Sequence, residues 1–173
     1  VFMIAKTGRV LWILLIFVSF LYAQAPDDTL GQKLKFAVDF NRFQLSDSLT
    51  YFEFYGSIPR KLLTYTPEEA HYRAEFRVDA KISQGDSIIA SKEWIQYNLA
   101  DSLKAIRPQQ RLHCINYFPL TKGDYTFSLG ITDNNNPANN NEYSVPINII
   151  EYDTDSLIVS DVQLASRIIK NTE

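Results

Sequence analysis

Apolar and polar residues alternate along most of the chain after residue 32, and this period of two is typical of β-strands with one packed and one wet face. The clearest case is Tyr72–Ser83. Its apolar positions are Tyr72, Ala74, Phe76, Val78, Ala80 and Ile82, and polar residues fill the positions between them. A helical period would instead put Arg73 and Arg77 on the face that holds Phe76 and Ala80. The segment is therefore predicted to be a strand of an antiparallel sheet, followed by a hairpin at Gln84-Gly85-Asp86.

The same alternation recurs in short segments separated by turn residues. Strands are predicted over residues 33–43, 49–57, 62–66, 72–83, 87–98, 111–118, 120–129 and 142–152. The polar stretch 100–110 is predicted to hold one helical turn. Pro146 cannot donate to a neighbouring strand, so the last strand is predicted at a sheet edge. About eight short strands indicate an all-β fold, an immunoglobulin/fibronectin-like antiparallel β-sandwich over residues 33–152.

The segment Leu120–Leu129 adds a more specific feature. It resembles the tyrosine corner that opens strand F of such sandwiches, in which a buried Tyr hydroxyl bonds to the backbone upstream. Gly123 and Tyr125 occupy the expected turn and tyrosine positions. The feature indicates an architecture and no ligand.

The first 25 residues have a different character. Lys6 and Arg9 precede the apolar run Val10–Tyr22, and Ala23-Gln24-Ala25 has the small-x-small form of a cleavage site. Residues 1–25 are therefore predicted to be a signal peptide, with an uncleaved anchor as the alternative. Residues 26–32 would be a lead-in. The protein is expected to be exported and to be periplasmic, outer-membrane-associated or extracellular. It would meet the membrane only through the signal segment during export.

The net charge and the cysteine content limit the possible partners and cross-links of the chain. Without Lys6 and Arg9 the chain has 15 basic and 20 acidic residues, a net charge of −5. A mildly acidic domain without a basic stripe is a poor match for phosphate backbones, so no nucleic-acid partner is expected. Cys114 is the only cysteine, which rules out an intrachain disulfide. It is predicted to be a small buried residue, with intermolecular pairing as the alternative.

No constellation of catalytic residues stands out, and no catalytic, cofactor-binding or metal residue is assigned. The six glycines form neither a dinucleotide fingerprint nor a phosphate loop, and Gly-x-Ser-x-Gly is absent. His71 and His113 could hold zinc with Cys114 only if the fold brought them together. The Asn-rich stretch 133–142 offers oxygen ligands for Ca²⁺, but a solvated loop explains it better.

Carboxylates and aromatic residues raise two further functional alternatives, glycoside hydrolysis and the binding of sugar or protein. The acidic pairs Glu68-Glu69 and Asp153 with Asp155 are expected to face water, since glycoside hydrolysis needs two carboxylates across a sugar. The aromatic residues Tyr51, Tyr55, Trp94 and Tyr97 could form a platform for sugar or protein. Core or cross-strand packing is the simpler interpretation of their spacing.

Three segments resemble a known family: residues 47–55, the tyrosine-corner segment, and residues 159–166. Together they look like the N-terminal region of GWxTD-domain proteins, which are exported bacterial proteins of uncharacterised function. The likeness covers roughly residues 33–170. The motif Gly-Trp-x-Thr-Asp is missing, since neither Trp12 nor Trp94 follows a Gly. In that family the motif lies in a second, downstream domain, so the resemblance implies that this chain is truncated or encodes only the sandwich half.

The residues that follow the predicted sandwich also bear on its function. Residues 153–173 are expected to be a tail or a linker to a C-terminal domain, and Ser160–Gln163 could be a capping box opening a short helix. Its apolar residues suggest that it packs on the sandwich or leads into a further domain. The leading hypothesis is a non-enzymatic exported module that binds or docks another protein or its own C-terminal domain, or serves as a structural module. The alternative is a carbohydrate-binding module that uses exposed aromatic residues.

Overall fold

Eight β-strands and two single-turn 3-10 helices make up residues 33–150, which with residues 159–161 are the part of the chain that a computed structural model describes. The strands are β1 (Ala37–Gln44), β2 (Thr50–Pro59), β3 (Thr66–Glu68), β4 (His71–Gln84), β5 (Ser87–Ala100), β6 (Arg111–Leu120), β7 (Gly123–Asp133) and β8 (Asn140–Ile149). The helices are η1 (Arg60–Leu62) and η2 (Leu103–Ala105). In these residues no helix has the length and apolar character needed to span a membrane.

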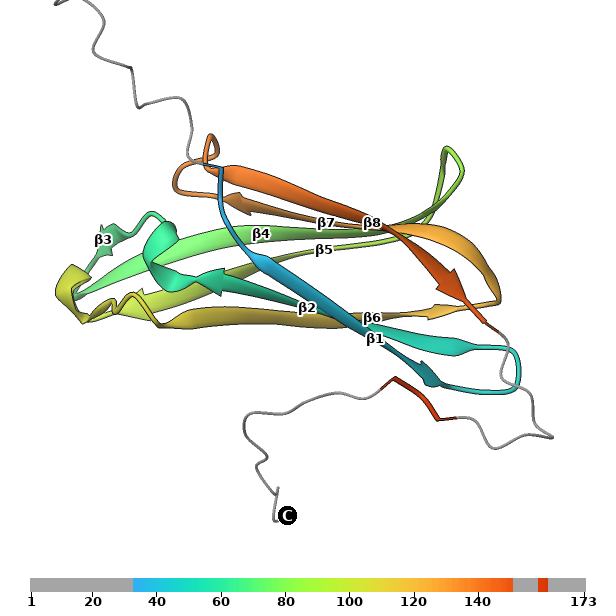
Figure 1. The fold of residues 1–173 in the computed structure, drawn as a ribbon. Helices are drawn as coiled ribbons and strands as arrows, with labels where there is room; N and C mark the ends of the chain where they lie inside the picture. Colours follow the sequence, from blue (N-terminus) through green and yellow to red (C-terminus); the bar gives the residue numbers. More distant parts are fainter. Residues whose placement is uncertain (1–32, 151–158, 162–173) are drawn as a thin grey trace, which may run out of the picture. The chain divides into compact units, whose positions relative to one another are not determined.

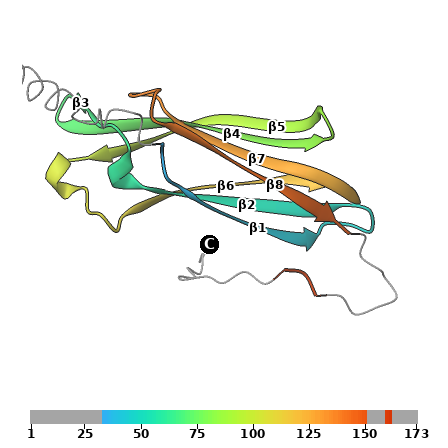
Figure 2. The same ribbon diagram turned by 45° about the horizontal axis from the view of Figure 1, so that its top comes forward.

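The strands form two antiparallel sheets that lie as separate layers (Figures 1 and 2). The three-stranded sheet has the order β1-β2-β6. In the five-stranded sheet, β5 pairs with β4, β4 with β7 and β7 with β8, while the short β3 pairs with the first residues of β4. The β4–β7–β8 arrangement corresponds to strands C, F and G of an immunoglobulin-like sandwich, with β5 added beyond strand C. The predicted all-β sandwich is confirmed.

The core lies between the two sheets and is built from the alternate positions of their strands. On β4 the predicted apolar face is confirmed, with Ala74, Phe76, Val78, Ala80 and Ile82 all buried. Phe127 of β7 joins the layers, because its ring centroid lies 5.1 Å from that of Phe52 and 4.9 Å from that of Phe54, both on β2. Burying large apolar side chains on both inner faces is the main source of stability for a domain without a disulfide.

The tyrosine corner is also confirmed. The Tyr125 hydroxyl donates to the main-chain oxygen of Thr121 at 3.1 Å and lies 3.1 Å from the Thr121 hydroxyl. A Cβ on residue 123 would lie 3.1 Å from the Tyr125 hydroxyl oxygen, so Gly123 leaves room for the ring to fold back over the turn. This contact fixes the start of β7 relative to the end of β6.

A few boundaries differ from the sequence-based prediction. The segment 62–66 is not a strand: the chain turns through η1 directly after Pro59, and β3 follows at Thr66. The last strand begins at Asn140 and ends at Ile149, rather than running over residues 142–152. The helical turn expected within 100–110 is η2.

Besides the three-residue β3, four longer strands, β1, β5, β6 and β8, lie at the borders of the two sheets. The position of Pro146 on an edge strand, β8, is as predicted, and β6 carries Pro119. Lys92 of β5 lies on the face whose neighbours Ala90 and Trp94 pack against the core, and its Nζ donates to Asn116 Oδ1 of β6 at 2.7 Å. Proline and inward-pointing lysine on border strands both oppose pairing with a further strand.

Several predicted features lie outside the described residues. They are the signal peptide at 1–25, the lead-in at 26–32, the pair Asp153 and Asp155, and the part of the tail from residue 162 onward with its helix.

Candidate functional site

The candidate zinc ligands are not assembled. His71 begins β4 in one sheet, and its Nδ1 lies 3.3 Å from Asp101 Oδ1 at the surface. His113 is exposed on β6 in the other sheet, whereas its neighbour Cys114 is buried. No group of three or more His, Cys, Asp or Glu residues that could hold a metal ion occurs within residues 33–150 and 159–161.

The Asn-rich loop is a structural tie to the segment before β3 rather than a plain solvated loop. Asn135 Nδ2 donates to the main-chain oxygens of Thr64 and Arg73, both at 2.9 Å, and Asn139 Nδ2 donates to the oxygen of Leu62 at 2.8 Å. Asp133, which is fully buried, accepts from the Thr64 N–H at 2.7 Å and from the Asn135 N–H at 3.0 Å. These amides donate to protein carbonyls, so their hydrogen bonds serve to hold two segments of the fold together.

The acidic pair that can be located faces water, as expected. Glu68 is exposed and its Oε1 lies 3.0 Å from Arg73 Nη1, while exposed Glu69 occupies the turn with a φ of 50°. The same Arg73 guanidinium binds Glu75 Oε2 through Nη2 at 2.9 Å, so both carboxylates are held in ion pairs.

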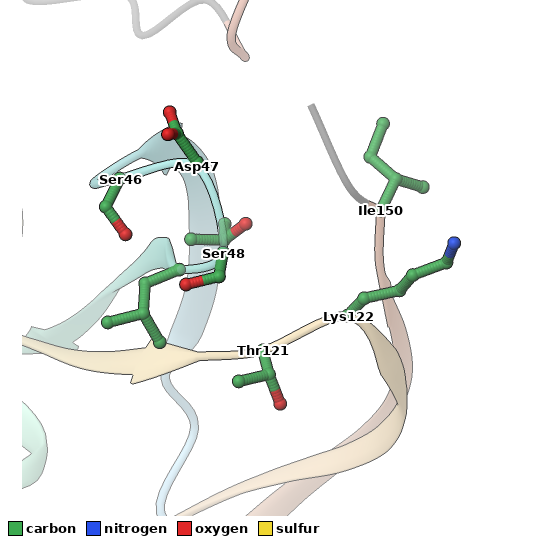
Figure 3. A pocket seen from close by; sticks show the side chains of 8 residues that line it. Ser46, Asp47, Ser48, Thr121, Lys122 and Ile150 are labelled. Carbon is green, nitrogen blue, oxygen red and sulfur yellow. The ribbon is translucent and has the colours of Figure 1, made fainter. Parts of the chain in front are cut away.

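One pocket of about 200 Å³ lies at the end of the sandwich (Figure 3). It is lined by Ser46, Asp47, Ser48, Leu49, Thr50, Thr121, Lys122 and Ile150. These residues come from the β1–β2 turn, the β6–β7 turn and the end of β8, and half of them carry a hydroxyl group. Ligand sites for small molecules usually enclose about 300–1,000 Å³. The pocket is below that range, and its floor includes the Thr121 side chain of the tyrosine corner.

The aromatic residues singled out from the sequence go to three places. Trp94 is half-buried and packs against the core, with its ring centroid 6.4 Å from that of Phe54. Tyr97 is 64% exposed on β5, in the five-stranded sheet. Tyr51 and Tyr55 lie on β2 at positions opposite its core-facing residues, and thus on the outer surface of the three-stranded sheet.

That outer surface gathers side chains from three strands. Strand register places Phe43 beside Tyr51 and Tyr51 beside Pro119, and in further rows Glu53 lies beside Tyr117 and Tyr55 beside Ile115. We name as the tyrosine face the apolar and aromatic set Phe43, Tyr51, Tyr55, Ile115, Tyr117 and Pro119. Ile115 is 56% and Tyr117 40% exposed. Sequence reasoning identified the two β2 tyrosines but not their neighbours on β1 and β6, because the strand order was unknown.

The rings of this face are ordered by close contacts. The Tyr51 and Tyr117 rings stack with centroids 4.3 Å apart, and Lys92 Nζ lies 4.2 Å from the Tyr117 centroid. Burial, followed by the negative charge of Glu53, raises the pKa of the Tyr51 hydroxyl above its usual value. Tyr51 therefore stays neutral at physiological pH and can donate a hydrogen bond.

The outer surface of the five-stranded sheet is different. Its β4 positions are Arg73, Glu75, Arg77, Asp79 and Lys81, which form several ion pairs. β5 places a row of exposed apolar side chains there, at Ile88, Ile95, Tyr97 and Leu99. The Arg73 guanidinium lies 4.8 Å above the Tyr97 ring. Charged outer positions such as those of β4 are the normal pattern for a sheet that faces water, whereas β5 and the tyrosine face both expose apolar side chains.

The free edge of β1 holds a distant part of the chain, at Arg42. Arg42 is the register partner of buried Phe52, and its Nη1 donates to the Asn148 oxygen of β8 at 3.1 Å. Asp161 is joined to Arg42, with Arg42 Nε and the Arg42 main-chain N–H both donating to Asp161 Oδ2, at 2.8 and 2.9 Å. The Asp161 N–H donates in turn to the Arg42 main-chain oxygen at 3.2 Å. The side-chain hydrogen bonds from Arg42 lower the pKa of the Asp161 carboxyl below its usual value, so the carboxylate is ionised near neutral pH.

No protein-family model, no curated protein and no solved structure matches this chain.

Proposed function

We propose that this chain is a non-enzymatic docking module of an exported protein, and that the tyrosine face is the surface on which it contacts another polypeptide. Export follows from the signal peptide predicted at residues 1–25. The partner would be a second protein or a domain joined to the sandwich. The resemblance to the sandwich region of GWxTD-domain proteins is in keeping with this role.

The observation that carries the proposal is the contrast between the two outer surfaces. In the five-stranded sheet the outer positions of β4 are charged and form several ion pairs, and the large exposed apolar side chains lie on β5. On the three-stranded sheet the aromatic and aliphatic residues of the tyrosine face come from all three strands. Contiguous apolar patches on an outer surface commonly mark interaction sites. Tyrosine is enriched in protein interfaces because its ring buries a large apolar area and its hydroxyl keeps a polar partner.

The geometry favours a polypeptide over a sugar. A sugar platform needs an aromatic ring whose flat face is open to the ligand. Tyr117 is stacked on Tyr51 and also lies against the Lys92 ammonium, while Tyr97 lies against the Arg73 guanidinium. Carbohydrate binding by the exposed aromatic residues is the second candidate, supported by the 64% exposure of Tyr97.

Site-specific photo-cross-linking tests the proposal in cells that export the full chain. A benzophenone amino acid would replace Tyr117 on the tyrosine face and, as the matched control, Glu142 on β8 of the other sheet. We expect cross-links to polypeptide from position 117 and not from position 142. Equal cross-linking at both positions, or none at position 117, would contradict the proposal. A glycan array with the same purified protein tests the second candidate, which requires binding that is lost on Tyr97→Ala.

A further inference from the structure

We propose that the tyrosine face is occupied by the chain's own segment 162–170, which continues directly from the Arg42–Asp161 contact. This inference rests on the proposed docking function and names the polypeptide that is docked. The contact places the start of the segment at the free edge of β1, beside the tyrosine face rather than on it. Arg42 lies on β1, the border strand of the three-stranded sheet, and four hydrogen bonds of 2.8 to 3.2 Å join it to Asp161.

Two polar atoms on the same surface indicate what the occupant must supply. Asn41 Nδ2 and Tyr55 Oη are buried and have no hydrogen-bond partner among the described residues. Asn41 is only 6% exposed, although it pairs in register with Glu53 on an outward-facing row. A buried donor without a partner loses the hydrogen bond that it would make to water. Main-chain carbonyls or side-chain oxygens of an adjoining segment would satisfy both atoms.

The residues that follow Asp161 have the right chemistry. Val162, Leu164, Ala165, Ile168 and Ile169 are apolar. The spacing of the last four matches one face of a helix. A helix over residues 162–170 would be about 14 Å long and about 10 Å wide. Three strands spaced about 4.8 Å apart span about 10 Å, so a helix of this size matches the width of the sheet.

The charges are complementary as well. Arg167 and Lys170 are the charged residues of the segment. The charged residues on the rows of the tyrosine face between Phe43 and Ile115 are Asp39 and Glu53, which are both acidic. Cationic side chains flanking an apolar stripe would therefore meet carboxylates on the sheet. Such pairs set orientation more than affinity.

Limited trypsin digestion of the full chain, followed by mass spectrometry, tests the inference because Arg167 and Lys170 are themselves cleavage sites. We expect cleavage there to be at least about tenfold slower than in a free peptide of residues 159–173, since proteolysis follows the population of the undocked state. The double variant Ile115→Ser, Tyr117→Ser should be cleaved at the rate of the free peptide. Asp161→Asn should increase the rate, because it removes the charge that Arg42 binds.

The matched control is Ile95→Ser, Tyr97→Ser, which removes two exposed apolar side chains from the other sheet and should leave the rate unchanged. All variants are checked for an unchanged far-ultraviolet circular dichroism spectrum. If the double variant on the tyrosine face fails this check, Ile115→Ser alone replaces it. Cleavage of the native chain at the free-peptide rate, or an equal effect of both double variants, would overturn the inference. Cross-links from position 117 to a different protein would then leave the docking function standing, whereas their absence would remove both.

Discussion

Gly56 and Cys114 are register partners on β2 and β6, and the Cys114 thiol fills the space that a side chain at residue 56 would need. A Cβ on residue 56 would also lie 3.3 Å from Leu129 Cδ2 and 3.9 Å from Ile131 Cδ1, both on β7. At residue 56 the three-stranded sheet thus lies directly against side chains of the opposite layer. The small size of Gly56 sets the local spacing of the two sheets.

Gly56→Ala is expected to lower the free energy of unfolding by about 1–3 kcal/mol, the usual cost of overpacking a core. Urea denaturation measures the change. The Cys114→Ala background removes the Sγ atom, and Gly56→Ala should cost less there by about 1 kcal/mol, since contacting residues are coupled. The same cost in both backgrounds would show that the thiol is not the obstacle.

Cys114 should also make stability depend on alkaline pH. Burial raises the pKa of its thiol from 9.0 to about 11. Above pH 9 the unfolded chain releases this proton while the folded chain keeps it, so stability falls as pH rises. The loss approaches about 1.4 kcal/mol per pH unit between the two pKa values. Urea unfolding of the wild type and Cys114→Ala at about pH 8 and about pH 10 isolates the effect, and parallel pH dependences would contradict it.

Most of the fold follows from residue patterning, as β4 illustrates. Alternation marks which side chains of Tyr72–Ser83 face the core, and Pro146 marks an edge strand, because both depend on local geometry. The tyrosine face does not follow in this way. Tyr51 and Tyr117 stack because β6 pairs with β2, and no local pattern in either strand specifies that neighbour.

The β3 region shows the same limit. Alternation at residues 62–66 suggested a strand, but the chain there is held by amides of the distant loop, with Asn139 Nδ2 bonded to the Leu62 oxygen. Long-range hydrogen bonds override weak local preferences in so short a segment. The Arg42–Asp161 contact is likewise invisible in sequence, since 119 residues separate its partners.

Asp133→Ala is expected to destabilise the protein by about 3 kcal/mol, because it leaves the Thr64 and Asn135 N–H groups without their acceptor. Thermal or urea unfolding gives the value. Asn136→Ala changes an exposed residue of the same loop and should shift stability by no more than about 0.5 kcal/mol. A similar small effect of both changes would mean that the loop is not a structural tie.

Tyr125→Phe removes the hydroxyl of the tyrosine corner while keeping the ring. The loss of its hydrogen bond to the Thr121 oxygen is expected to cost about 1 kcal/mol. Tyr143→Phe on β8 provides the control, since Tyr143 is exposed, and it should be close to neutral. Equal unfolding midpoints for the two variants would show that the corner contributes no net stability.

Lys92, Pro119 and Pro146 bear on how the protein behaves when crowded in solution. Two open sheets offer backbone groups to any extended chain that meets their borders, which is the usual first step toward fibrils. A strand added at β5 would confine the Lys92 ammonium in a drier environment, and the prolines on β6 and β8 offer it no N–H group. These three residues therefore raise the free energy of fibril nucleation at the borders formed by β5, β6 and β8. At the remaining long border strand, β1, Asp161 is hydrogen-bonded to Arg42.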